Sequence, residues 1–179
     1  MNNSPVFLFS IRKQMNRLLI ALLFSSGLAF IHNSPTVSIK NFKPAFGKWK
    51  GTLTYLDYSS GRPYTMPANV IISRDNNNEH QLILAFEYPD EPKANGNDTL
   101  IISNDGLQID GAAVVSKKKT SEGFLEIVTE KDGIDGNDNR KAVLKHIYTI
   151  GKKMFSNRKE VRFDGEEKFI LRNEYKMSR

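Results

Sequence analysis

Alternating apolar and polar residues constrain the fold of this chain more than any other feature. From Lys48 onward they form runs of about 6–11 residues, each ending in a cluster of Gly, Asn, Asp, Ser or Pro. Within 140–150, for example, Leu144, His146 and Tyr148 occupy every second position. Side chains of a β-strand point alternately to its two faces, so this period predicts strands with one packed face. No amphipathic helix is indicated from Phe46 onward.

Nine or ten such strands follow one another with mostly short connections. Their expected ranges are 48–58, 64–74, 80–88, 99–103, 107–109, 112–116, 123–130, 140–150, 154–163 and 168–177. Asp105-Gly106, Asp110-Gly111 and Asp164-Gly165 carry the signature of tight hairpin turns. A sequential meander favours an all-β, antiparallel up-and-down barrel of about 8–10 strands, which removes its own edges by closing. A two-sheet β-sandwich has similar strand statistics and is the alternative.

Three local features carry further expectations. Pro67 cannot donate a hydrogen bond to a neighbouring strand, so its strand begins at an edge or after a bulge. Lys117-Lys118-Lys119 is read as a solvated turn, or else as a contact for an anion or a lipid headgroup. The Asp- and Asn-rich segment 131–139 is read as a hairpin loop. Its composition resembles a calcium loop, but it lacks the EF-hand spacing and the closing glutamate.

The N-terminal segment differs in composition from the rest of the chain. Arg12, Lys13 and Arg17 precede an apolar run from Leu18 to Phe30, and no acid occurs before them. This pattern predicts a signal peptide over 1–29, cleaved after Ala29, with Met1 or Met15 as its start. The run is short for a membrane span, which needs roughly 20 apolar residues. An uncleaved N-terminal membrane anchor is the alternative.

Export to the periplasm or secretion from the cell is therefore the expected fate. The mature chain then consists of a polar lead-in over 30–45 and a barrel over 46–179, with no membrane-spanning helix after cleavage. The chain has no cysteine, which excludes a disulfide framework, a thiolate metal site, a cysteine nucleophile and a lipidated cysteine. Without Arg12, Lys13 and Arg17 the net charge falls from +6 to +3. A net charge that small does not call for nucleic acid or an acidic membrane.

The segment from Asn41 to Trp49 resembles the opening of lipocalins and related calycin barrels. Those families begin with Asn-Phe and then Gly-x-Trp at the start of the first strand, as Gly47-Lys48-Trp49 does here. The resemblance implies that Trp49 seals the closed end of a barrel and that a late arginine packs across it. Arg162 and Arg172 are the candidates, and we assign Gly47, Trp49 and Arg172 structural roles. The related fatty-acid-binding proteins clamp a carboxylate with Arg-x-Tyr, where this chain has Asn173-Glu174-Tyr175 without the arginine.

The expected function is binding of a small hydrophobic ligand in the barrel interior, because such a barrel can enclose a cavity. The candidate lining residues are Leu53, Tyr55, Leu84, Phe86, His146, Tyr148 and Tyr175. His146 alternates with apolar residues, so it is either a polar, metal or haem contact in a cavity or a hydrogen-bonded core histidine. No His-x-His or His-x-x-x-His spacing indicates a metal site, and we expect no cofactor.

Two other functions remain in view. Large side chains could fill the barrel completely, and the protein would then be an envelope β domain that binds a protein partner through its loops. Those side chains are Trp49, Phe86, Phe124, Phe155, Phe163 and Phe169. Catalysis is the least favoured reading, since no Gly-x-Ser-x-Gly and no P-loop occurs.

Overall fold

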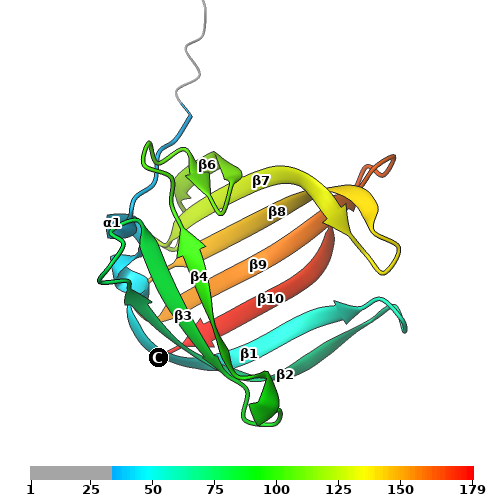
Figure 1. Cartoon of the computed structure of the whole chain (residues 1–179), viewed down its shortest axis with the longest axis horizontal. Helices are drawn as coiled ribbons and strands as arrows, with labels where there is room; N and C mark the ends of the chain where they lie inside the picture. The colour runs from blue at the N-terminus through cyan, green and yellow to red at the C-terminus, as the bar shows by residue number, and fades with distance from the viewer. Residues whose placement is uncertain (1–33) are drawn as a thin grey trace, which may run out of the picture. The chain divides into compact units, whose positions relative to one another are not determined.

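Ten antiparallel strands form one sheet that curls into a nearly closed barrel (Figure 1). The computed structural model describes residues 34–179, so the expected signal peptide and its cleavage point lie outside the described residues. The strands are β1 Gly47–Asp57, β2 Arg62–Arg74, β3 Gln81–Glu87, β4 Gly96–Ile101, β5 Gln108–Ile109, β6 Ala112–Lys119, β7 Leu125–Asp135, β8 Arg140–Ile150, β9 Met154–Phe163 and β10 Ile170–Ser178. Their order in the sheet is β4-β3-β2-β1-β10-β9-β8-β7-β6-β5. The expected up-and-down barrel is confirmed, and one continuous sheet replaces the two sheets of a sandwich.

The barrel closes through few contacts between the two ends of the sheet. Ile102, just after β4, forms an isolated bridge with Ile109 of β5. Asp110 completes this seam, because its N–H donates to the carbonyl of Ile101 and its carboxylate accepts from the N–H of Ile101, both at 2.8 Å. Burial raises the pKa of Asp110 against the opposing effect of this hydrogen bond.

Strand length divides the barrel into two halves. β1, β2, β7 and β8 have 11, 13, 11 and 11 residues, whereas β3 and β4 have only 7 and 6. In Figure 1, β3 and β4 lie in front of one half of β8, β9 and β10, and the hairpins β1–β2 and β7–β8 extend beyond them. The larger hydrophobic core lies in the half that β3 and β4 cover, and its buried members include Trp49, Leu82 and Ile127.

The lead-in contributes to this core, although its sequence reads as polar. It forms a short helix, α1 Ile39–Phe42, followed by a 3₁₀ turn, η1 Lys43–Ala45. Asn41 caps α1 by accepting a hydrogen bond from the N–H of Ser38 at 2.9 Å. Phe42 and Ala45 are buried, and the rings of Phe42 and Tyr148 pack in a T-shaped arrangement with their centroids 5.9 Å apart. The segment therefore packs into the core at this end, which we call the α1 end.

Trp49 anchors the α1 end. Its Nε1 donates to the carbonyl of Ala45 at 2.6 Å, and the guanidinium of Arg179 lies 4.1 Å from its ring centroid. The expectation that Arg162 or Arg172 packs across Trp49 is therefore wrong. A bulge between Leu171 and Asn173 shifts the register of β10, and Arg172 lies over Tyr58 instead. Gly47 fits its expected structural role, because it has φ +114° and a Cβ there would lie 2.9 Å from Nη1 of Arg179.

Two segments that read as loops continue strands. β6 runs to Lys119 and so includes the three lysines, and β7 runs to Asp135 and leaves only a short turn before β8. Polar and glycine-rich composition was misleading there, because these strand ends stay paired. Lys118 and Lys119 keep exposed side chains, whereas the side chain of Asp135 is only 7% exposed. Pro67 fits its expected position, since β2 pairs with β3 only from Asn69 onward and has a free edge before it.

Candidate functional site

The strand register arranges the inner face of the barrel in rows that cross neighbouring strands. One row, called here the polar row, consists of Thr129, His146, Lys159, Asn173, Tyr55 and Tyr64, each the cross-strand partner of the next. These residues share the face that carries Trp49 and Phe155, because every second residue of a strand points to the same side. Polar groups therefore cross five strand pairs on the inner face.

Apolar clusters lie on both sides of the polar row. Toward the α1 end comes a mixed row of Ile127, Tyr148, Asn157, Tyr175, Leu53 and Met66, which borders the larger core. Away from the α1 end, Ala142, Val161 and Phe163 form a second small core. The part of the polar row on β7, β8 and β9 thus borders hydrophobic clusters, where an unsatisfied polar group is costly, whereas Tyr64 at its other end is 51% exposed.

An ion cluster, called here the Asp135 cluster, joins the polar row to the far end of the barrel. The carboxylate of Asp135 accepts hydrogen bonds from Nζ of Lys159, Nε of Arg172 at 3.2 Å and the hydroxyl of Tyr58 at 3.0 Å. Burial alone would raise the pKa of Asp135, but the hydrogen bonds from Lys159, the Gly136 N–H and Tyr58 outweigh it and lower this pKa. Burial also raises the pKa of Tyr58 to about 12.

His146 lies in the polar row between Thr129 and Lys159, and its environment favours the neutral imidazole. Burial lowers its pKa, and the charges of Lys159 and Lys131 add to that effect against its hydrogen bond with Asn157. Its Nδ1 lies 3.4 Å from Oδ1 of Asn157, and its ring lies 6.0 Å from that of Tyr148. Within residues 34–179 this is the ring's hydrogen bond, which leaves Nε2 able to meet a further polar group.

Thr129 is the cross-strand neighbour of His146 and is fully buried, with 0% of its surface exposed. Its Oγ1 has no hydrogen-bond partner among the described residues. Leaving a buried hydroxyl unpaired costs about 1–3 kcal/mol. A polar group from outside the chain could remove that cost only after the side chains that cover Thr129 move, because no surface of this residue is exposed.

Aromatic side chains complete this region of the inner face. The hydroxyls of Tyr88 and Tyr175 lie 2.7 Å apart, which ties the end of β3 to β10. Phe86 lies 4.7 Å from the ring of Tyr175, and Tyr55 lies 5.5 Å from that of Tyr64. Burial is the main cause that raises the pKa of Tyr175, so its hydroxyl stays protonated and can donate.

The structure groups some of the predicted lining residues and separates others. Leu53, Tyr55, His146 and Tyr175 lie in the polar and mixed rows, and Phe86 packs against Tyr175. Tyr148 also belongs to the mixed row but is buried in the larger core at 3% exposure, and Leu84 lies in that core outside both rows at 5% exposure.

Sequence reasoning missed other residues of this region, namely Tyr58, Thr129, Asp135, Asn157 and Lys159. Alternation along β9 was the available signal, since Asn157 and Lys159 share the parity of Val161 and Phe163.

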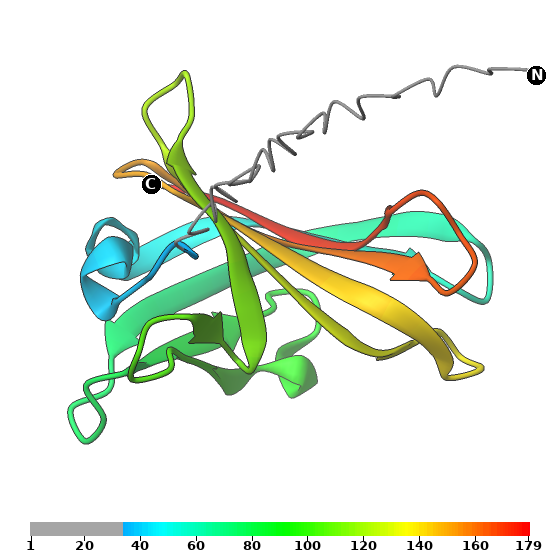
Figure 2. The same cartoon turned by 90° about the horizontal axis from the view of Figure 1, so that it is seen from above.

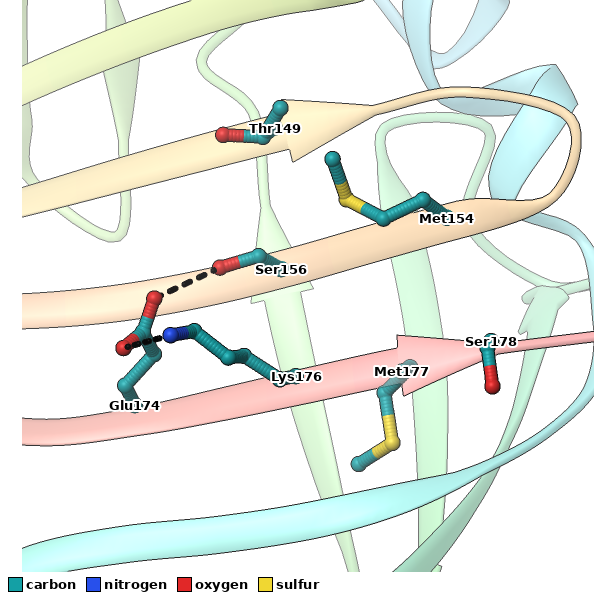
Figure 3. A pocket seen from close by; sticks show the side chains of 7 residues that line it. All are labelled: Thr149, Met154, Ser156, Glu174, Lys176, Met177 and Ser178. Carbon is teal, nitrogen blue, oxygen red and sulfur yellow. Dashed lines mark hydrogen bonds and ion pairs between the residues drawn. The ribbon is translucent and has the colours of Figure 1, made fainter.

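A separate hollow of about 440 Å³ lies on the outer face of β8, β9 and β10. Three of its polar side chains are joined, because Glu174 accepts from Ser156 at 3.4 Å and pairs with Lys176 at 3.4 Å (Figure 3). Among the described residues, none of those that line this hollow has a buried side-chain polar atom without a partner, so we do not treat it as the candidate site. In residues 34–179 no group of His, Asp and Glu side chains is arranged so that it could bind a metal ion. The same residues contain no helix long and apolar enough for a membrane span.

Comparison with known proteins finds no matching family and no matching curated protein. Among solved structures, the chain is similar to the crystal structure of Rv2717c from M. tuberculosis, with a TM-score of 0.45 and 13% identity. The match covers 79% of this chain and 96% of that one.

Proposed function

We propose that the inner face around the polar row binds a small, mainly apolar molecule that carries one polar group. The observation that carries this proposal is the buried Thr129 hydroxyl, which lacks a partner in the described part of the chain and lies beside a neutral His146. A ligand's hydrogen-bonding group would meet Nε2 of His146, and it would reach the Thr129 hydroxyl once the side chains that cover Thr129 move apart, since this residue is 0% exposed. Binding without chemical change is proposed, since no nucleophile and base are paired there.

The surroundings support an apolar ligand body. Leu53, Phe86 and Tyr175 flank the polar row, and such side chains supply affinity while a few polar groups supply orientation. In the Asp135 cluster, Lys159 and Arg172 both pair with the single carboxylate of Asp135. The electrostatic potential where this cluster meets the polar row is therefore weakly positive. A neutral or singly anionic polar group suits that field, whereas a cationic one does not.

Two broader expectations remain proposals. Packing of Arg179 across Trp49 supports a calycin-like barrel, although the arginine is not one of those expected. Export rests on the composition of 1–29, with an N-terminal anchor as the alternative.

Native mass spectrometry of residues 33–179 after exposure to a lipid extract tests the binding proposal. We expect a discrete added mass that survives desalting. Thr129→Val and His146→Ala should each weaken retention of the ligand about tenfold, because each variant removes roughly one hydrogen bond to it.

Thr54→Val is the matched control, because Thr54 lies on the outer face of β1 and bonds Thr65 there. This control should retain the ligand like the unchanged protein. A bare protein mass in every sample would overturn the proposal and favour a protein partner bound through the loops.

A further inference from the structure

Basic side chains gather at the α1 end, although the net charge of the mature chain is small. This group, called here the basic end, consists of Lys40, Lys43, Lys117, Lys118, Lys119, Lys152, Lys153 and Arg179. Figure 2 shows α1, the C-terminus and the β6–β7 and β8–β9 turns together on one side of the barrel. All of these side chains except that of Lys117 belong to exposed residues.

Hydrogen bonds hold the basic end together. Nζ of Lys117 donates to the carbonyl of Thr36 at 2.7 Å, next to α1. Arg179 donates to the carbonyls of Lys152, Phe46 and Pro44, which links the C-terminus to the β8–β9 turn and to η1. Lys117 and Arg179 are therefore held in place, and their bonds connect the lead-in, the C-terminus and the β8–β9 turn that carry the other cations.

Carboxylates at this end are fewer, and most of them are engaged locally. Glu126 pairs with Lys118 at 3.2 Å, Asp105 accepts from Ser103 and Leu107, and Glu79 pairs with Arg74 at 3.9 Å. The charges of these carboxylates remain, as does that of exposed Glu122 in the β6–β7 turn, but the cations at this end outnumber them, so the surface keeps a net positive charge.

Exposed aliphatic side chains border the basic end. Leu107 and Val115 are 38% and 49% exposed, and the N–H of Val114 donates to the carbonyl of Leu107 at 2.8 Å. The chain enters the barrel beside them, since the N–H of Val37 donates to the carbonyl of Gly106 at 2.9 Å. Cations beside exposed aliphatic groups are typical of surfaces that lie in a membrane interface.

We propose that the basic end docks the barrel on a membrane that contains anionic phospholipid, with Leu107 and Val115 reaching the interface. Charge complementarity to anionic headgroups favours such an occupant. In the alternative in which 1–29 is an uncleaved anchor, the apolar run Leu18–Phe30 also precedes the point, at Val37, where the chain enters this end. A nucleic acid would also meet the charges but would gain nothing from the two aliphatic side chains.

Vesicle binding at low ionic strength tests this proposal. Residues 33–179 form a compact unit with their own core, so they can be studied without the preceding apolar run. We expect sedimentation with vesicles of phosphatidylcholine and phosphatidylglycerol and none with phosphatidylcholine alone. The variant Lys118→Glu, Lys119→Glu, Lys152→Glu, Lys153→Glu should bind at least about a hundredfold more weakly, since each surface lysine contributes about fivefold.

A matched variant reverses four exposed charges away from the basic end: Arg62→Glu, Lys93→Glu, Lys141→Glu, Lys168→Glu. It should bind the anionic vesicles within about fivefold of the unchanged protein. Equal losses in both variants would show that net charge alone drives binding, and no binding to either vesicle would also overturn the proposal. Tighter binding to a short RNA than to the anionic vesicles at the same salt would replace the membrane with a nucleic acid.

A fluorescent label reports the orientation. Because the chain has no cysteine, Leu107→Cys offers a single site for a polarity-sensitive dye. Its emission should shift to the blue on anionic vesicles, whereas the dye at Ile134→Cys, which is 58% exposed at the far end of β7, should not respond. A shift at Ile134 alone would contradict the proposed orientation.

Discussion

Thr129 and Asp135 lie on the same inner face of β7 and differ in how their polar atoms are satisfied. Asp135 receives hydrogen bonds from Lys159, Arg172 and Tyr58, whereas Thr129 receives none from the described residues. A buried group that is fully bonded serves stability, and a buried group left unpaired reduces it. The contrast separates a structural polar cluster from a candidate binding position within one strand.

Thr129→Val should stabilise the ligand-free protein by about 1 kcal/mol, because it keeps the side-chain shape and removes an unpaired hydroxyl. Urea unfolding of the delipidated protein measures this change in the free energy of unfolding. A loss of stability would show that the hydroxyl has a partner and would remove the main support for the proposed site.

Asp135→Asn should cost about 2 kcal/mol at neutral pH, since Lys159 and Arg172 lose their buried carboxylate. The pKa of Asp135 is lower in the folded protein than its ordinary value of 3.8. The stabilisation is therefore complete above the unfolded pKa and is lost as the pH falls through the folded one. The difference between the two proteins should shrink in urea titrations below about pH 4, and a difference that stays constant would contradict this account.

Strands were the most predictable elements of this chain. The alternation is local, so the expected ranges 140–150 and 154–163 match β8 and β9 residue for residue. Bulges are not visible in such a pattern. The bulge at Arg172 turned a residue expected beside Trp49 toward Asp135, and the residue that does cover Trp49, Arg179, follows the last strand.

Contact between β1 and β10 depends on a glycine. A Cβ at Gly51 would lie 1.9 Å from the carbonyl oxygen of Lys176, so the two backbones could not keep their spacing. Gly51→Ala should therefore lower the free energy of unfolding by about 3 kcal/mol. Gly96→Ala in β4 is the control, because its Cβ would meet nothing nearer than 3.9 Å and should change stability by less than about 0.5 kcal/mol. Equal effects in thermal unfolding would contradict the close approach.

At the scale of the whole molecule, the barrel was predictable and its inner site was only partly so. His146 and Tyr175 were found from alternation, because each lies on an apolar face of its own strand. The Asp135 cluster was missed because it joins Tyr58 to a residue 77 positions away, and no local pattern records such a contact. Strand register, which depends on the closed topology, brings these groups together.

Chemical-shift mapping of residues 33–179 during titration with the lipid extract is the most direct test of the central claim. The account predicts saturable shifts at Thr129, His146 and Tyr175 on the inner face, with Thr54 and Lys145 on the outer face unchanged. Shifts confined to the loops or the outer face, or no shifts at all, would contradict ligand binding inside the barrel.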